Sequence, residues 1–234
     1  MSNNLEKKRK ETQKRLQYFE ELSKYRNIDF PNNLTIICKN NLEELNKYFT
    51  EKIINHINYR IKFDYDLLTV IYNYVASLKS YLNRKKRAIE TRCKSVNKAE
   101  LTSIFEKYWK ANRNKTILDK LITIRDRMEH DTLTTGIKLE TCFCQECIER
   151  KLVVDNIDII ELSNKGYEEL ISLGRDIENF VEKRLTELNL RDCCLFMNAF
   201  NRFFNKPPYT QLFPEETIDE KNYYDNLIKA LKND

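Results

Sequence analysis

Glycine and proline are scarce in this chain, and that scarcity limits the folds it can adopt more than any other feature. Only 3 glycines and 4 prolines occur among its 234 residues. Folds rich in tight turns need many residues that accept a positive φ or that pre-set a turn. The chain is instead rich in Leu, Ile, Lys and Glu, which suit helices. We therefore expect a mainly α-helical protein.

Apolar residues recur at three- and four-residue spacing, which is the pattern of amphipathic helices that share one core. This pattern predicts one helical body. The helical pattern is interrupted at residues 28–33, because Pro31 has no backbone N–H to donate to a helical hydrogen bond. Five of the expected helices cover residues 2–26, 41–59, 115–132, 163–188 and 217–232. A long helix capped by Asp64 or Asp66 is expected to reach about residue 89, and another is expected to begin after Ser95 or Asn97.

The apolar period changes after Gly136. The segments "IKLETCFC" and "ERKLVVDNIDIIEL" alternate or are β-branched, and each is too short for another core helix. They predict a two-stranded β-hairpin near residues 137–161, with "QECIER" at or near its turn. We expect three parts: an N-terminal helix and linker (1–35), a helical domain with the hairpin (36–190), and an aromatic-rich C-terminal tail (191–234) that forms a helical appendage.

Composition and charge narrow the classes of protein. The chain is 41% hydrophobic and 33% charged, which is typical of a soluble globular protein. No apolar run approaches the roughly 20 residues that a helix needs to cross a bilayer. The first residues, "MSNNLEKKRKETQKRLQ", lack the apolar segment that a secretory signal contains. We expect a cytoplasmic protein without a membrane partner. Its net charge of +5 is compatible with a nucleic-acid partner but does not require one.

Several common catalytic motifs are absent from the sequence. It has no glycine-rich phosphate loop, no HExxH, no GxSxG and no calcium-binding loop. A general base that works near neutral pH would be one of the two histidines or a perturbed carboxylate. His56 lies among apolar residues in "IINHINY", where we expect a hydrogen-bonded, partly buried side chain.

The second histidine, His130, ends the predicted helix 115–132, and Arg125 lies one turn before it. A histidine near a helix C-terminus also interacts favourably with the helix dipole and needs no further role. An imidazole beside a guanidinium nevertheless suits RNA scission, in which the ribose 2′-hydroxyl attacks the adjacent phosphorus. Histidine can move the proton, and arginine can bind the phosphoryl oxygens. No metal is required for this chemistry.

The spacing of the two residues sets a geometric condition. Side chains five positions apart on an ideal helix differ in direction by roughly 140°. Arg125 and His130 therefore do not share one face. Either the helix ends and turns between them, or a second copy of the chain completes the site in a twofold dimer.

The segment "RDRMEH" (125–130) resembles the R-x(4–6)-H signature of HEPN domains, in which Asn, Asp or His commonly follows the arginine. The upstream segment "YNYVASLKSYLNRKKR" (72–87) resembles the helix with an Asn-x-x-Ala-Ser pattern that precedes the signature in some HEPN groups. One predicted helix separates the two segments, as in those groups. The resemblance covers residues 40–190.

This resemblance implies a homodimeric up-and-down helical bundle with metal-independent endoribonuclease activity that requires no cofactor. Such proteins are often toxins or abortive-infection effectors in prokaryotic defence against phage, so an antitoxin or defence-system partner is also implied. By position, Arg125 and His130 would be catalytic and Asp126 would orient them. The alternative is a non-catalytic helical module that binds RNA or a partner protein.

Cations near the signature and in the upstream helix are candidate contacts to RNA phosphates. Arg127 and Lys120 belong to the same predicted helix as Arg125. Arg84 and Lys85 belong to the basic run "RKKR" (84–87). Solvated helix faces would give the same pattern.

The cysteines and the aromatic tail leave alternatives open. Cys142, Cys144 and Cys147 have a spacing that can place three thiolates around one structural zinc. The fourth ligand would have to be Cys38, Cys93, Cys193 or Cys194. Small buried residues on a strand would give the same alternation. We expect the tail cluster to pack against the body of the protein, although it could instead cover a dimer seam or stack on unpaired bases beside Arg202 and Lys206. Its members are Phe196, Phe200, Phe203, Phe204, Tyr209 and Phe213.

Overall fold

A computed structural model describes residues 2–28, 32–54, 65–93, 96–110, 116–130, 136–143, 148–154, 156–209 and 216–233. These residues form eight α-helices, one short π-helix and three strands, which confirms a mainly α-helical fold with a small β insertion. The chain divides into two compact units. One comprises residues 28–179, and the other combines residues 1–27 with 180–234. The expected division was into 1–35, 36–190 and 191–234, so the contacts group the two ends differently.

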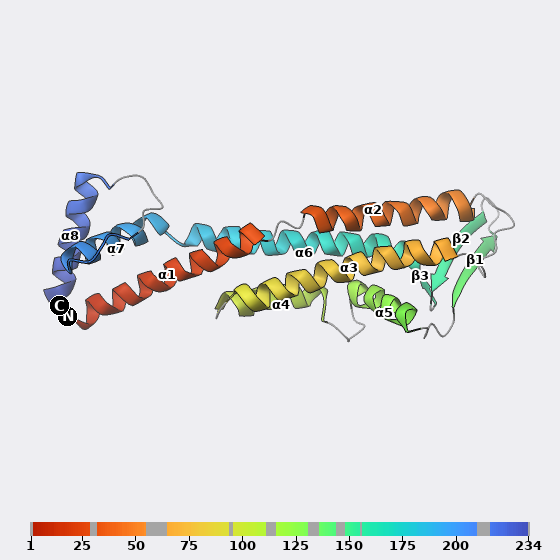
Figure 1. The fold of residues 1–234 in the computed structure, drawn as a ribbon, viewed down its shortest axis with the longest axis horizontal. Coiled ribbons are helices and arrows are strands. Elements are labelled where there is room, and N and C mark those ends of the chain that lie inside the picture. The colour runs from red at the N-terminus through yellow and green to blue at the C-terminus, as the bar shows by residue number, and fades with distance from the viewer. Residues whose placement is uncertain are drawn as a thin grey trace. The chain divides into compact units, whose positions relative to one another are not determined.

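The larger unit is a helical body built around α3 (Tyr65–Arg92). Helix α3 packs on α2 (Asn32–Tyr48), on α4 (Val96–Tyr108) and on α5 (Ile117–Glu129), as Figure 1 shows. Helix α6 (Ile159–Glu187) runs beside α3, where the Tyr74 hydroxyl donates to the Ser163 carbonyl oxygen at 2.6 Å. The core between these helices holds Leu42, Leu45, Leu67, Ile71, Leu78, Leu82, Leu101, Leu118, Leu121, Leu170, Leu173 and Ile177, all buried.

Several helix boundaries differ from the sequence-based expectation. The helix expected over 41–59 begins nine residues earlier, at Asn32, and continues through a π-helical turn at Phe49–Ile54. The expected apolar face is nevertheless the buried one, because Leu42, Leu45, Phe49 and Ile53 all lie in the core. The candidate cap Asp64, the candidate start Ser95 and His56 lie outside the described residues.

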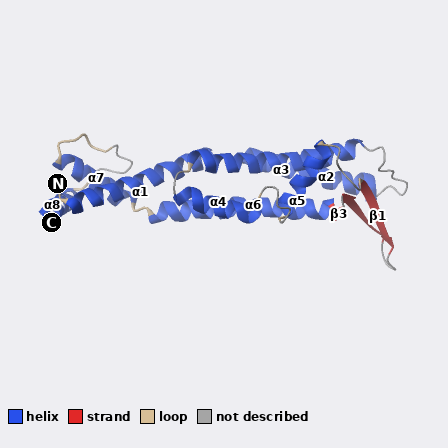
Figure 2. Cartoon of the chain, turned by 90° about the horizontal axis from the view of Figure 1, so that it is seen from below, coloured by secondary structure: helices blue, strands red, loops and turns tan. Residues whose placement is uncertain are grey.

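The β insertion contains the expected antiparallel hairpin, formed by β1 and β2, and a short third strand that was not expected. Strands are drawn in red in Figure 2. Strand β1 (Ile137–Phe143) pairs with β2 (Ile148–Val154), which pairs with the short β3 (Ile157–Asp158). The expected start of α6 at Ser163 was also wrong, since the helix begins at Ile159. The Asp158 carboxylate accepts hydrogen bonds from the backbone N–H groups of Ile160 and Glu161, and so caps the earlier start.

The smaller unit brings both ends of the chain into one core. It contains α1 (Asn3–Ile28), α7 (Leu190–Phe203) and α8 (Ile218–Asn233). Leu5 and Leu16 of α1 belong to the same buried cluster as Phe196 and Phe200 of α7 and Ile228 of α8. The tail is therefore two helices that pack on α1. The expectation that the tail aromatics pack against protein is confirmed for the described ones, while Phe213 lies outside the described residues.

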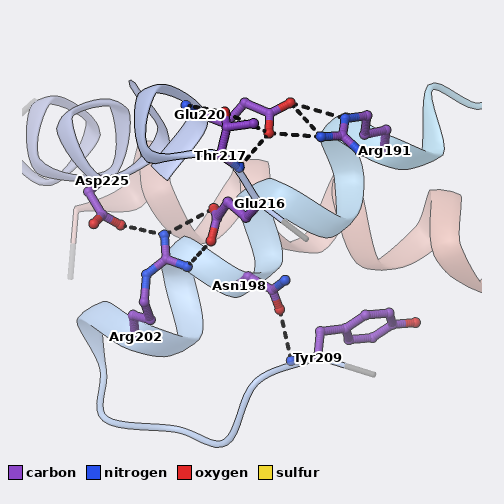
Figure 3. A network of polar contacts seen from close by, with 8 residues as sticks. All are labelled: Arg191, Asn198, Arg202, Tyr209, Glu216, Thr217, Glu220 and Asp225. Atoms are coloured by element: carbon purple, nitrogen blue, oxygen red, sulfur yellow. Dashed lines mark hydrogen bonds and ion pairs between the residues drawn. The ribbon is translucent and has the colours of Figure 1, made fainter. Parts of the chain in front are cut away.

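Polar contacts join α7 to α8 and to the segment before it (Figure 3). Arg191 donates to both carboxylate oxygens of Glu220, at 2.7 and 2.8 Å. Arg202 contacts Glu216 at 2.5 Å and Asp225 at 2.8 Å. Two carboxylates therefore hold the Arg202 guanidinium.

None of the helices in the described part of the chain combines the length and the apolar content that crossing a membrane requires.

Candidate functional site

Helix α5 positions both Arg125 and His130. Thr116 caps its N-terminus by accepting a hydrogen bond from the backbone N–H of Asp119, at 3.1 Å. Leu118, Leu121 and Ile124 form the buried face of the helix, where Asp119 is also buried, whereas the residues from Arg125 to His130 are half-buried or exposed. The helix thus ends in a polar last turn that begins at Arg125.

Carboxylates hold the Arg125 guanidinium on two sides. Its Nη1 contacts Asp126 at 2.9 Å, and its Nη2 forms an ion pair with Glu129. The guanidinium also lies 5.9 Å from the centre of the Tyr72 ring, on α3. Burial lowers the pKa of Arg125, but the hydrogen bond to Asp126 and the charge of Glu129 outweigh it, so the net shift is upward. Arg125 is therefore a permanent cation in a fixed position.

Helix α3 contributes two further groups to the same cluster. Lys79 donates to the Asp126 carboxylate at 2.6 Å, and the Tyr72 hydroxyl donates to Glu129 at 2.8 Å. Burial raises the pKa of Asp126, but the hydrogen bonds and charges of Lys79 and Arg125 outweigh it and lower that pKa. We call Tyr72, Lys79, Arg125, Asp126 and Glu129 the Arg125 cluster. It contains two cations and two anions, so its formal charge balances.

His130 lies at the end of α5 with an exposed side chain. Its backbone N–H donates to the Asp126 carbonyl oxygen at 3.2 Å, which is the helical i to i−4 bond. The helix ends at Glu129, but its hydrogen bonding continues through the His130 N–H. The chain therefore makes no turn between Arg125 and His130, and such a turn was one of the two expected ways to bring them together. In the described part of the chain no hydrogen bond joins the two side chains.

The four cations that were predicted to contact RNA phosphates differ in their exposure to solvent. Arg84 and Lys120 are exposed and Arg127 is half-buried. Lys85 is buried, with 3% of the residue exposed, and its ammonium lies 5.5 Å from the centre of the Tyr81 ring. Burial lowers the pKa of Lys85 to about 8, while the charge of Glu178 opposes the shift. The prediction that Lys85 contacts RNA was therefore wrong, because its side chain points into the helical body.

The Asn-x-x-Ala-Ser pattern of α3 does not join the cluster. The Ser77 side chain is buried and hydrogen bonds to the Tyr74 carbonyl oxygen, at 2.6 Å. Ser77 also hydrogen bonds to the Cys38 thiol, whose pKa burial raises to about 11. The residues of α3 that reach the cluster, Tyr72 and Lys79, were not predicted. Their seven-residue spacing, which places them on one helix face, is the signal that could have identified them.

The structure leaves the proposed zinc ligands untested. Cys142 pairs with Glu149 across β1 and β2, while Cys144 and Cys147 lie outside the described residues. The candidates for a fourth ligand, Cys38, Cys93, Cys193 and Cys194, are buried free thiols. The described residues contain no group of three or more His, Cys, Asp or Glu side chains that could hold a metal ion.

Comparisons of the chain with protein-family models, with curated proteins and with solved structures find no match. The Arg125 cluster must therefore be interpreted from its own chemistry.

Proposed function

We propose that the protein is a metal-independent endoribonuclease of HEPN type. The observation that carries the proposal is the last turn of α5, where a fixed Arg125 guanidinium precedes an exposed His130 imidazole. In this proposal His130 moves the proton of the ribose 2′-hydroxyl or of the leaving oxygen, and Arg125 stabilises charge on the phosphoryl group. Asp126 orients Arg125 and is itself held by Lys79.

The proposal includes a twofold dimer. Because α5 stays helical through the N–H of His130, the side chains of Arg125 and His130 keep their offset of roughly 140° on the helix. A second copy would supply the complementary Arg–His pair, so that one cleft holds both an acid and a base. A role as a toxin or an abortive-infection effector in anti-phage defence, restrained by an antitoxin or another partner, belongs to the same proposal.

A second function is favoured by the charge balance of the cluster. Glu129 and Asp126 already occupy Arg125, so a phosphate must compete with two carboxylates for its guanidinium. A non-catalytic module that binds RNA or a partner protein would not require Arg125 to leave the Asp126 and Glu129 carboxylates. Cleavage measurements separate the two functions.

The test uses purified full-length protein, single-stranded RNA and excess EDTA. Wild type should cleave the RNA, and His130→Ala should lower the rate by roughly 100-fold or more, the usual contribution of a general acid or base. Arg125→Ala should lower it by a similar factor, about 100-fold or more. The control Arg175→Ala removes an exposed cation on α6 and should leave the rate unchanged.

Expression in bacteria provides a second measurement of the same proposal. An active nuclease should slow growth, and Arg125→Ala should restore it. If wild type leaves RNA intact in EDTA, or if His130→Ala cleaves at the wild-type rate, the catalytic assignment is wrong.

A further inference from the structure

A small cavity opens between α3 and α4 and contains no residue of the Arg125 cluster. Its volume is about 90 Å³. Trp109 and Phe105 line it, with ring centres 5.6 Å apart and planes at 75°. Both aromatic residues are buried against the helical body, so they form a rigid apolar wall. A planar apolar group fits such a wall best, because flat rings gain most from contact with aromatic side chains.

Charged side chains of both signs surround this wall. Lys86 and Lys110 are the cations, and Glu90 and Glu106 are the anions. The Lys86 ammonium lies 5.9 Å from the centre of the Trp109 ring and 4.0 Å from the Glu90 carboxylate. The Lys86 side chain is 48% exposed, so it can move aside for a ligand without leaving water.

The mixture of charges selects among ligand classes. Two lysines disfavour an organic cation, and two carboxylates disfavour a simple anion. A ligand that offers a hydrogen-bond donor to a carboxylate and an anionic group to a lysine suits this mixture, and a nucleotide offers both. Its base is a flat ring whose exocyclic amino group can donate to a carboxylate, and its phosphate can accept from a lysine.

The cavity lies on the same face of α3 as the Arg125 cluster. Tyr72, Lys79 and Lys86 are spaced by seven residues, and two helical turns return a side chain to nearly the same direction. Tyr72 and Lys79 contact α5, whereas Lys86 lies over Trp109 beyond the end of α4. The rise along the helix from Lys79 to Lys86 is about 10 Å. One extended strand of nucleic acid could therefore reach from the cluster to the cavity.

We propose that the cavity between α3 and α4 is a nucleobase subsite. Trp109 and Phe105 contact the base, Glu90 or Glu106 accepts from its exocyclic amino group, and Lys86 and Lys110 bind the adjacent phosphate. That the base belongs to single-stranded RNA rests on the proposed function. The subsite selects adenine and cytosine over uracil, because uracil has no exocyclic amine.

Trp109 reports on this cavity directly, because it is the only tryptophan in the chain. The test titrates Arg125→Ala protein with AMP, CMP, UMP and ribose 5-phosphate and follows tryptophan fluorescence. AMP and CMP should quench it saturably, UMP should bind more weakly, and ribose 5-phosphate should have no effect. Lys86→Ala should raise the apparent Kd for AMP roughly tenfold, and Arg87→Ala, which removes a neighbouring exposed cation outside the cavity, should not change it.

The outcomes distinguish this subsite from the proposed function. Quenching by AMP without RNA cleavage by wild type would support the subsite and overturn the nuclease. Cleavage without quenching by any nucleotide would support the nuclease and overturn the subsite. Equal quenching by choline, or an unchanged AMP affinity in both Lys86→Ala and Trp109→Phe (the latter measured by calorimetry), would also overturn it.

Discussion

At the scale of single residues, two glycines of α6 predict opposite responses to the same substitution. A Cβ at Gly166 would overlap the Cδ1 of Leu121, a fully buried side chain of α5. A Cβ at Gly174 would meet only the Tyr81 hydroxyl, at 3.4 Å. Gly166→Ala should lower the free energy of unfolding by about 1–3 kcal/mol through overpacking. Gly174→Ala should raise it by about 0.5–1 kcal/mol through helix propensity.

Urea unfolding followed by circular dichroism measures both effects. The two variants differ by the same methyl group on the same helix, so each is the control for the other. A stabilising Gly166→Ala would show that α5 and α6 do not approach as closely as described. The sequence alone does not predict this difference, because nothing in it shows which residue of α5 faces Gly166.

At the scale of elements, the ion pairs between α7 and the following segment differ in burial, and so in their expected effect. Glu216 is 12% exposed and relies on Arg202, whereas Glu220 and Arg191 are 29% and 36% exposed. Arg202→Met should cost about 1–3 kcal/mol of unfolding free energy, because it leaves a buried acceptor without its partner. Arg191→Met should cost less unfolding free energy than Arg202→Met, because water screens an exposed ion pair. Equal losses in urea unfolding would contradict this ranking.

Periodicity was sufficient to predict most elements but not their ends. The buried faces of α2, α3 and α5 follow the apolar spacing, which depends only on local sequence. The start of α6 was missed because Asp158 caps the helix directly after a strand. The isoleucine-rich run "IDII" (157–160) is compatible with both a strand and a helix. Helix α7 was missed because its aromatic density suggested an irregular tail, although the buried run 193–200 is helical.

The same limit applies to the candidate site. Arg125 and His130 were predicted from their spacing, and their catalytic roles stay a prediction. The structure places Arg125 in the last turn of α5 and His130 at its C-cap. Tyr72 and Lys79 reach the cluster only through the packing of α3 on α5, a contact between segments about 50 residues apart. Lys85 shows the opposite error: a basic run suggested exposure, but the helix turns this one residue inward.

At the scale of the whole molecule, the chain ends form one unit and the candidate chemistry lies in the other. The Ser2 hydroxyl hydrogen bonds to the Leu231 carbonyl oxygen, and Leu5 shares a core with Leu231. No local pattern could predict this grouping, because it joins segments at opposite ends of the sequence. The Arg125 cluster and the cavity beside Trp109 both belong to residues 28–179.

The most direct test of the central claim is cleavage of RNA in which single 2′-hydroxyls have been replaced by hydrogen. The assay uses wild-type protein in EDTA, and the products are analysed for their end groups. If the 2′-hydroxyl is the nucleophile, the RNA is not cleaved at any 2′-deoxy position. Products cut at the remaining positions carry 2′,3′-cyclic phosphates. Cleavage at the 2′-deoxy positions at an undiminished rate, or products without the cyclic phosphate, would contradict the mechanism proposed for Arg125 and His130.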